Sequence, residues 1–174
     1  YAYAKKMKGV FLLRIEDTDR VRYVPGAEDR IMDTIIDFGL PWDEGVRVGG
    51  EYGPYTQSQR LDIYKKYALE LVEKGNAYYC FCSKERIDEL RKAQQEAHLP
   101  TTKYDKHCLG LTSEQVQKNL KDGAPYVIRL NVPKDQIIKF RDEILGDLEF
   151  SSNDLDDQVL LKSDGFPTYH LGVV

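Results

Sequence analysis

The sequence predicts an α/β protein whose main fold is interrupted by an inserted α+β unit, and three observations lead to this prediction. The apolar run at 10–15 is typical of a strand buried on both faces, as in parallel sheets. Two amphipathic helices are predicted after it, at 25–38 and 58–74. At Asn76 the pattern changes to short strands and strongly charged helices. An apolar strand near 158–162 marks the point where the chain returns to the main α/β fold.

The two helices of the first part are predicted from their ends and their apolar stripes. Pro25 is expected to open the first helix, and the acidic residues Glu28 and Asp29 suit its N-terminal dipole. The sequence predicts that Gly39 ends it. The apolar stripe of this helix is predicted to consist of Ala27, Ile31, Ile35 and Phe38. The second helix is predicted to stop at Gly75 and to bury Leu61, Tyr64, Ala68, Leu71 and Val72.

The inserted part is predicted to contain two capped helices. Ser83 is expected to cap a helix that runs to about His98. Thr112 and Gln115 form a capping-box pattern for a shorter helix that ends at Gly123. The inward residues of the longer helix are predicted to be Ile87, Leu90 and Ala97.

Short strands are expected between and after these helices. A strand-like stretch is predicted at 78–82, and alternation predicts a half-buried strand at 126–132 in which Arg129 faces solvent. Further strands are predicted near 147–150 and 158–162. The latter ends at a turn formed by Asp164 and Gly165.

Composition excludes several classes of protein. The chain has 174 residues and a net charge of −4, and it has no apolar run long enough to cross a membrane. Its first residues lack the apolar segment of a signal peptide. Three cysteines are too few for a disulfide scaffold and favour a reducing, cytoplasmic compartment. Any contact with nucleic acid would have to come from a local basic patch, because the whole chain is acidic.

A cluster of charged residues at 14–20 follows the first predicted strand. Ligands of open α/β sheets bind at the carboxyl ends of strands, so Glu16 is a candidate for holding a ligand ammonium group, with Arg14 nearby. The alternatives are a salt-bridged strand terminus and, with fewer donors than usual, a Mg²⁺ site at Asp17 and Asp19.

A second cluster consists of three cysteines with possible partners. One residue separates Cys80 from Cys82, so both thiolates can face one ion. Cys108 can supply a third thiolate, as in tetrahedral zinc sites. The spacing leaves the fourth ligand open between Tyr104 and His107. The alternative is that the cysteines are small buried apolar side chains.

Two further segments carry weaker signals. The polar segment 53–60 lacks the glycine spacing and lysine of a phosphate-binding loop, so a loop with a helix cap is favoured. Tyr169 and His170 could line the same crevice as Glu16, although a lone histidine is more often structural.

Four segments, in this order, together resemble glutamyl-tRNA synthetase, a class I aminoacyl-tRNA synthetase. They are FLLRIEDTDR at 11–20, RYVPGAEDRI at 22–31, GPYTQSQR at 53–60 and LLKSDGFPTYHL at 160–171. The resemblance implies a partial Rossmann-type catalytic domain that begins with residues 1–75 and returns at 158–174. It also implies that residues 76–157 form the inserted domain that binds the tRNA acceptor stem.

The resemblance also implies roles for particular residues. Glu16 inherits the contact with the amino group of substrate glutamate, and Tyr169 lines the same pocket. Val173 stands where the family has a substrate-binding asparagine, so one polar contact differs. The zinc set that the resemblance favours is Cys80, Cys82, Tyr104 and Cys108.

The activity that the resemblance implies is ATP-dependent formation of glutamyl-adenylate, with Mg²⁺, and transfer of glutamate to the 3′ end of tRNA(Glu). The family's ATP-binding motifs, HIGH and KMSKS, are not in the sequence, so we expect an internal piece of a longer, monomeric enzyme that does not form the adenylate alone. Two alternatives are a glutamyl-queuosine tRNA(Asp) synthetase, which modifies a tRNA base, and a non-enzymatic zinc module that binds RNA.

Overall fold

The computed structural model describes residues 1–19 and 24–173, which form two compact units. The first unit contains residues 1–64 and 169–174, and the second contains residues 65–168. Arg20, Arg22 and Tyr23 of the predicted motifs lie outside the described residues. In the described part, no helix is long and apolar enough to cross a membrane.

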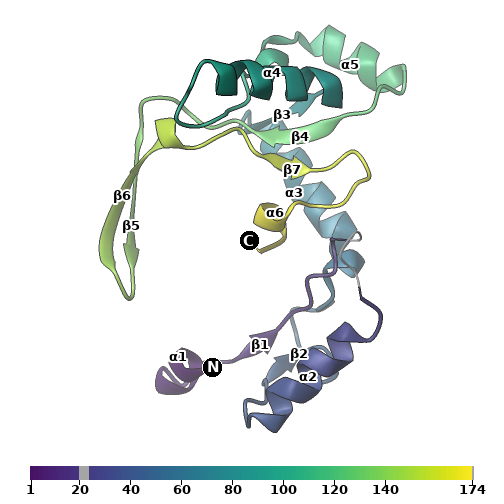
Figure 1. The fold of residues 1–174 in the computed structure, drawn as a ribbon. Helices are drawn as coiled ribbons and strands as arrows, with labels where there is room; N and C mark the ends of the chain where they lie inside the picture. Colours follow the sequence, from purple (N-terminus) through teal and green to yellow (C-terminus); the bar gives the residue numbers. More distant parts are fainter. Residues whose placement is uncertain (20–23, 174) are drawn as a thin grey trace. The chain divides into compact units, whose positions relative to one another are not determined.

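The first unit is built around a small parallel sheet (Figure 1). Strand β1 pairs with β2 through Leu12 and Glu44, and an isolated parallel bridge joins Ile15 to Thr56. This bridge brings the residues after β1 next to the segment that opens the next helix. The elements that lie wholly in this unit are α1 Ala2–Lys6, β1 Leu12–Leu13, α2 Ala27–Asp37, β2 Glu44–Gly45, the 3₁₀ helix η1 Gln57–Arg60 and α6 Tyr169–Val173.

The prediction of a doubly buried strand at 10–15 is wrong in extent and burial. Strand β1 spans only Leu12 and Leu13, and Leu12 is 43% exposed. The strand is short because its partner β2 is equally short, and Leu12 is exposed because little of the first unit packs over the face on which it lies. Burial begins at Ile15, immediately before the charged cluster.

Helix α2 forms as predicted but buries a different face. It begins at Ala27, after Gly26 in the left-handed region (φ +73°), and not at Pro25. Met32 is its buried residue, whereas Ile31 and Phe38 of the predicted stripe are exposed. A sheet of two such short strands is too small to cover a whole helix face, so most of the stripe stays in contact with solvent.

Helix α3 (Leu61–Glu73), which follows η1 directly, confirms its predicted stripe. Tyr64 and Ala68 are buried, and Gly75 takes the left-handed conformation (φ +74°) expected after a helix C-terminus.

The second unit contains a three-stranded antiparallel sheet in the order β3-β4-β7. A separate hairpin of β5 and β6 extends away from this sheet (Figure 1). The elements that lie wholly in the second unit are β3 Ala77–Cys80, α4 Lys84–Glu96, η2 His107–Gly110, α5 Ser113–Lys121, β4 Val127–Leu130, β5 Ile137–Asp142, β6 Gly146–Ser151, η3 Ser152–Asp154 and β7 Val159–Leu161. The sequence predicted β6 but missed β5, its partner.

Both predicted helix caps of this unit are confirmed. Ser83 Oγ accepts from the backbone N–H of Arg86 (3.3 Å), and Thr112 with Gln115 forms the full capping box. The prediction that Ala97 points inward is wrong, because α4 ends at Glu96 and Ala97 is exposed.

The prediction that Arg129 faces solvent is also wrong. Strand β4 is the central strand of the sheet, and other residues of the unit cover both of its faces. Ile128 on one face is completely buried, and Arg129 on the other is only 8% exposed. Alternation along one strand cannot reveal this, because it says nothing about what covers each face of the strand.

The side chain of Asp157 contacts residues from several elements of this unit. It is 2% exposed and accepts hydrogen bonds from the Tyr78 hydroxyl (2.6 Å) and the Val132 amide (3.0 Å). The Lys106 ammonium also contacts it, at 2.8 Å. Burial, followed by the bond to Asp157, raises the pKa of Tyr78 far above its usual value.

We expect Asp157→Ala to destabilise the second unit by about 3–5 kcal/mol, because it leaves the Lys106 charge and two buried donors without their partner. Urea unfolding followed by circular dichroism would show a lower midpoint. Asp147→Ala is the matched control, because Asp147 makes an exposed hairpin ion pair with Arg141 and should change the midpoint little. An unchanged midpoint for Asp157→Ala would contradict this role.

Candidate functional site

Glu16 lies where the sequence placed it, just beyond the end of β1. It lines a cavity of about 440 Å³ in the first unit. Its side chain is 34% exposed, and Arg14 Nη2 lies 3.8 Å from Glu16 Oε1. The described residues that line the cavity are Leu13, Arg14, Ile15, Glu16, Asp17, Asp19, Val24, Ala27, Glu28 and Ile31. A carboxylate therefore faces a space large enough for a small molecule, at the strand end where ligands bind in α/β proteins.

The residues next to Glu16 hold the loop in place. Asp17 Oδ1 accepts from the Ser58 amide (2.8 Å), and Thr18 Oγ1 donates to Gln57 Oε1 (3.4 Å). Asp17 thus caps the first turn of η1. Among the described residues, no group of three potential His, Cys, Asp or Glu ligands forms at this cavity, so the alternative of a Mg²⁺ site at Asp17 and Asp19 gains no support.

Tyr169 is not brought to this cavity. It begins the short helix α6 instead of lying at the end of a strand, it is 64% exposed, and its ring contacts His170. It is not among the described residues that line the space in front of Glu16. The Asp164–Gly165 turn before it forms as predicted, with the Phe166 amide bonded to Asp164 Oδ1 (2.9 Å).

Gln57 is a site residue that sequence reasoning missed. It is completely buried, and it touches both the loop after β1, through Thr18, and helix α6, at Gly172. A Cβ added to Gly172 would lie 2.6 Å from Gln57 Nε2. The segment 53–60, which contains Gln57, stood out in the sequence, but nothing in that segment indicated that the Gln57 side chain would be buried. Gln57 thus joins the two segments that carry Glu16 and Tyr169.

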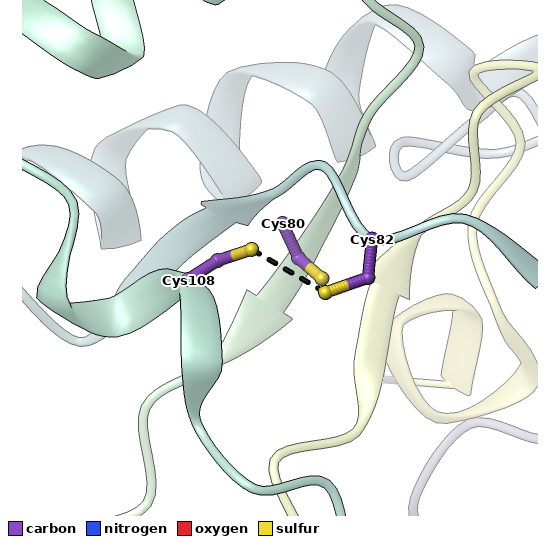
Figure 2. Close-up of side chains that lie close together, drawn as sticks. All are labelled: Cys80, Cys82 and Cys108. Carbon is purple, nitrogen blue, oxygen red and sulfur yellow. Dashed lines mark hydrogen bonds between the residues drawn. The ribbon is translucent and has the colours of Figure 1, made fainter. Parts of the chain in front are cut away.

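The three cysteines meet in the second unit (Figure 2). Cys80 ends β3, Cys82 follows two residues later, and Cys108 is supplied by η2. Their sulfur atoms all lie within 4.8 Å of one another, and the Sγ atoms of Cys82 and Cys108 are 3.5 Å apart. Cys80 and Cys108 are buried, and all three thiols are free.

Tyr104 completes this group. Its hydroxyl oxygen lies 3.3 Å from Cys80 Sγ and 3.2 Å from Cys82 Sγ, and it accepts from the Cys108 amide (3.1 Å). His107 is exposed, and its ring nitrogens are not part of the cluster in the described chain. Of the two residues that the spacing left open, Tyr104 is therefore the one whose donor atom faces the sulfurs.

The thiols perturb one another electrostatically. A hydrogen bond with Cys108, supported by Tyr104, holds the pKa of Cys80 well below its usual range, although burial opposes the shift. The same bond to Cys80, followed by burial, raises the pKa of Cys108. Burial is the main cause that raises the pKa of Tyr104. The cluster therefore favours one thiolate, which is the charged form that a metal requires.

The donor set fits a tetrahedral zinc ion. Zinc–sulfur bonds of about 2.3 Å place ligand sulfurs roughly 3.8 Å apart in a tetrahedron, which is close to the separations in this cluster. Three sulfurs and a phenol oxygen give four donors in a closed, buried arrangement. Such closure is typical of structural zinc sites, which keep no position for substrate.

The chain is similar to known proteins along its whole length. The family model described as "tRNA synthetases class I (E and Q), catalytic domain" matches residues 1–174. Glutamate–tRNA ligase of Clostridioides difficile is 53% identical over 100% of this chain, and that of Treponema denticola is 54% identical over 98%. A crystal structure of a glutamate tRNA ligase from Elizabethkingia meningosepticum, in complex with its amino acid, superposes with a TM-score of 0.90 and 40% identity over 99% of this chain. The chain covers only 37%, 34% and 36% of these three proteins, respectively.

Proposed function

Because the chain belongs to the family of class I tRNA synthetase (E and Q) catalytic domains, we propose that it is part of a glutamate–tRNA ligase. The proposed reaction joins L-glutamate to the 3′ end of tRNA(Glu) and uses ATP with Mg²⁺. The structural observation that carries this proposal is Glu16, whose carboxylate lines a cavity at a strand end. Relatives at 53% and 54% identity over nearly the whole chain support the choice of glutamate.

Glu16 binds the substrate ammonium group in this proposal. A charge-assisted hydrogen bond from the ammonium to the carboxylate orients the amino acid, and Arg14 Nη2 lies 3.8 Å from the same carboxylate. Catalysis in this class consists of positioning and charge stabilisation, so no nucleophilic side chain is needed. Tyr169 does not line the cavity in front of Glu16 in this structure, so its proposed role as a second substrate-binding residue rests on the family resemblance alone.

Residues 76–157 are proposed as the inserted domain that binds the acceptor stem. Cys80, Cys82, Cys108 and Tyr104 would hold a zinc ion there, which would crosslink β3, η2 and the loop before η2. The ion supplies folding free energy and no chemistry at the substrate. The remaining parts, residues 1–75 and 158–174, are proposed to belong to the catalytic domain. The proposed activity, together with the free cysteines, favours a cytoplasmic, monomeric enzyme.

Charging assays on the full-length protein that contains this chain test the proposal. We expect transfer of labelled L-glutamate to tRNA(Glu), dependent on ATP, and no comparable transfer of L-glutamine. Transfer to tRNA(Asp) instead would favour the queuosine-modifying relative. RNA binding with no transfer to either tRNA would favour a non-enzymatic module, and both results would contradict the proposal.

A further inference from the structure

Arg129 is a buried cation for which the described residues offer no carboxylate partner. Its side chain is 8% exposed, Nη1 donates to the backbone carbonyl of Asp157 (2.9 Å), and Nε has no hydrogen-bond partner. A buried charge is expensive unless an opposite charge faces it. Asp156 lines the same small cavity as Arg129 but forms no ion pair with it in the described chain, so a further source of negative charge would stabilise the guanidinium.

The guanidinium of Arg129 lies over the ring of Tyr104, with 4.1 Å between Arg129 Cζ and the ring centroid. This separation is within the range of a cation–π contact. The hydroxyl of the same ring lies 3.3 Å or less from two of the cysteine sulfurs. Arg129 is thus joined to the cysteine cluster through the aromatic ring and also through a side-chain hydrogen bond with Cys80.

The charge of a filled cluster explains why a cation is needed there. Zinc binds cysteines as thiolates, so three thiolates around Zn²⁺ already leave a net charge of about −1. The two other cations near the cluster are already paired. Arg86 forms an ion pair with Asp105 (2.6 Å), and Lys106 forms one with Asp157 (2.8 Å).

We propose that Arg129 is the counter-ion of the zinc centre, and that its contact with the ring positions Tyr104 as the fourth ligand. The proposal rests on the zinc site proposed above. It also gives Arg129, in the central strand of the sheet, a role in the site. Arg129 is not among the site residues predicted from the sequence. A centre with a histidine in place of Tyr104 would lack the phenol ring that Arg129 contacts and would depend less on Arg129.

Zinc affinity, measured by competition with a chromophoric chelator, tests this role in the full-length protein. We expect Arg129→Met to weaken zinc binding by about 10–100-fold, as is usual for residues that orient metal ligands. Arg129→Lys, which keeps the charge, should recover most of this loss. Arg141→Met, a surface arginine on the hairpin, is the matched control and should bind zinc like wild type.

A double-variant cycle separates the positioning of Tyr104 from simple support of the fold. In a Tyr104→His background we expect Arg129→Met to cost about tenfold less in zinc affinity than it does in wild type, because the phenol ring that Arg129 positions is gone. The visible spectrum of the Co²⁺-substituted protein should change with Arg129→Met but not with Arg141→Met. If the Arg129→Met variant does not fold, the zinc affinities of Arg129→Gln and Arg129→Lys can be compared instead, because only the second variant keeps the charge.

The possible failures are distinguishable. A wild-type protein that binds no zinc would contradict the zinc site itself. Normal zinc binding by wild type, with an unchanged affinity in Arg129→Met or an equal loss in both backgrounds, would contradict the role of Arg129 alone.

Discussion

Glu16→Gln is expected to lower kcat/KM for L-glutamate by about 10²-fold or more in the full-length protein. The substitution keeps the size of the side chain but removes the charge of the carboxylate that is assigned to the substrate ammonium, so the ammonium would lose that charged partner. Truncating one member of such a charged pair costs about 2–5 kcal/mol, and every 1.4 kcal/mol is tenfold. Steady-state charging of tRNA(Glu) at varied glutamate concentrations measures the effect.

Asp62→Asn is the matched control for this variant, because it removes a carboxylate from an exposed position in the first turn of α3. It should leave the KM for glutamate unchanged. A Glu16→Gln enzyme with wild-type kcat/KM would mean that the carboxylate has no part in substrate binding.

The second large effect is expected from Cys80→Ser. Cys80 is buried at the end of β3, and its sulfur contacts the Tyr104 hydroxyl, so a hydroxyl in its place removes one thiolate from the centre of the cluster. We expect zinc content to fall from about one ion per protein to nearly none, and the second unit to unfold at a lower temperature. Elemental analysis and thermal unfolding measure the two changes.

Treating wild type with a strong chelator provides the control for Cys80→Ser. Chelation should reproduce the lower unfolding temperature of the variant and should not lower the temperature of the variant further. Since zinc is proposed to stabilise the acceptor-stem domain, the KM for tRNA should rise more than the KM for glutamate. Wild type that contains no zinc, or whose stability does not respond to chelation, would contradict the proposal.

Local signals in the sequence were sufficient for some elements. Helix caps at Ser83 and Thr112 depend on residues three positions apart, so the pattern that predicts them also contains the groups that form them. The three cysteines were brought together as their spacing suggested, because β3 and η2 carry them from the two ends of one excursion. The placement of Glu16 beside a cavity likewise follows from its position after a strand.

Other features depend on contacts that a single segment cannot reveal. Arg129 is buried because other residues of the unit, among them Tyr104, cover the second face of β4, and the alternation within β4 cannot reveal this cover. Helix α2 turns Met32 inward instead of Ile31, because the small sheet covers only part of the helix. Gln57 looked like a loop residue, but the bridge between Ile15 and Thr56 draws its segment into the interior.

Binding of glutarate compared with L-glutamate tests the central claim most directly. Glutarate has both carboxylates of glutamate but lacks the ammonium group, so only a contact with that group can distinguish the two. We expect wild-type full-length protein to bind glutamate at least about tenfold more tightly in calorimetry, and Glu16→Gln to lose this preference. An equal preference for glutamate in wild type and in Glu16→Gln would contradict the assignment of the ammonium contact to Glu16.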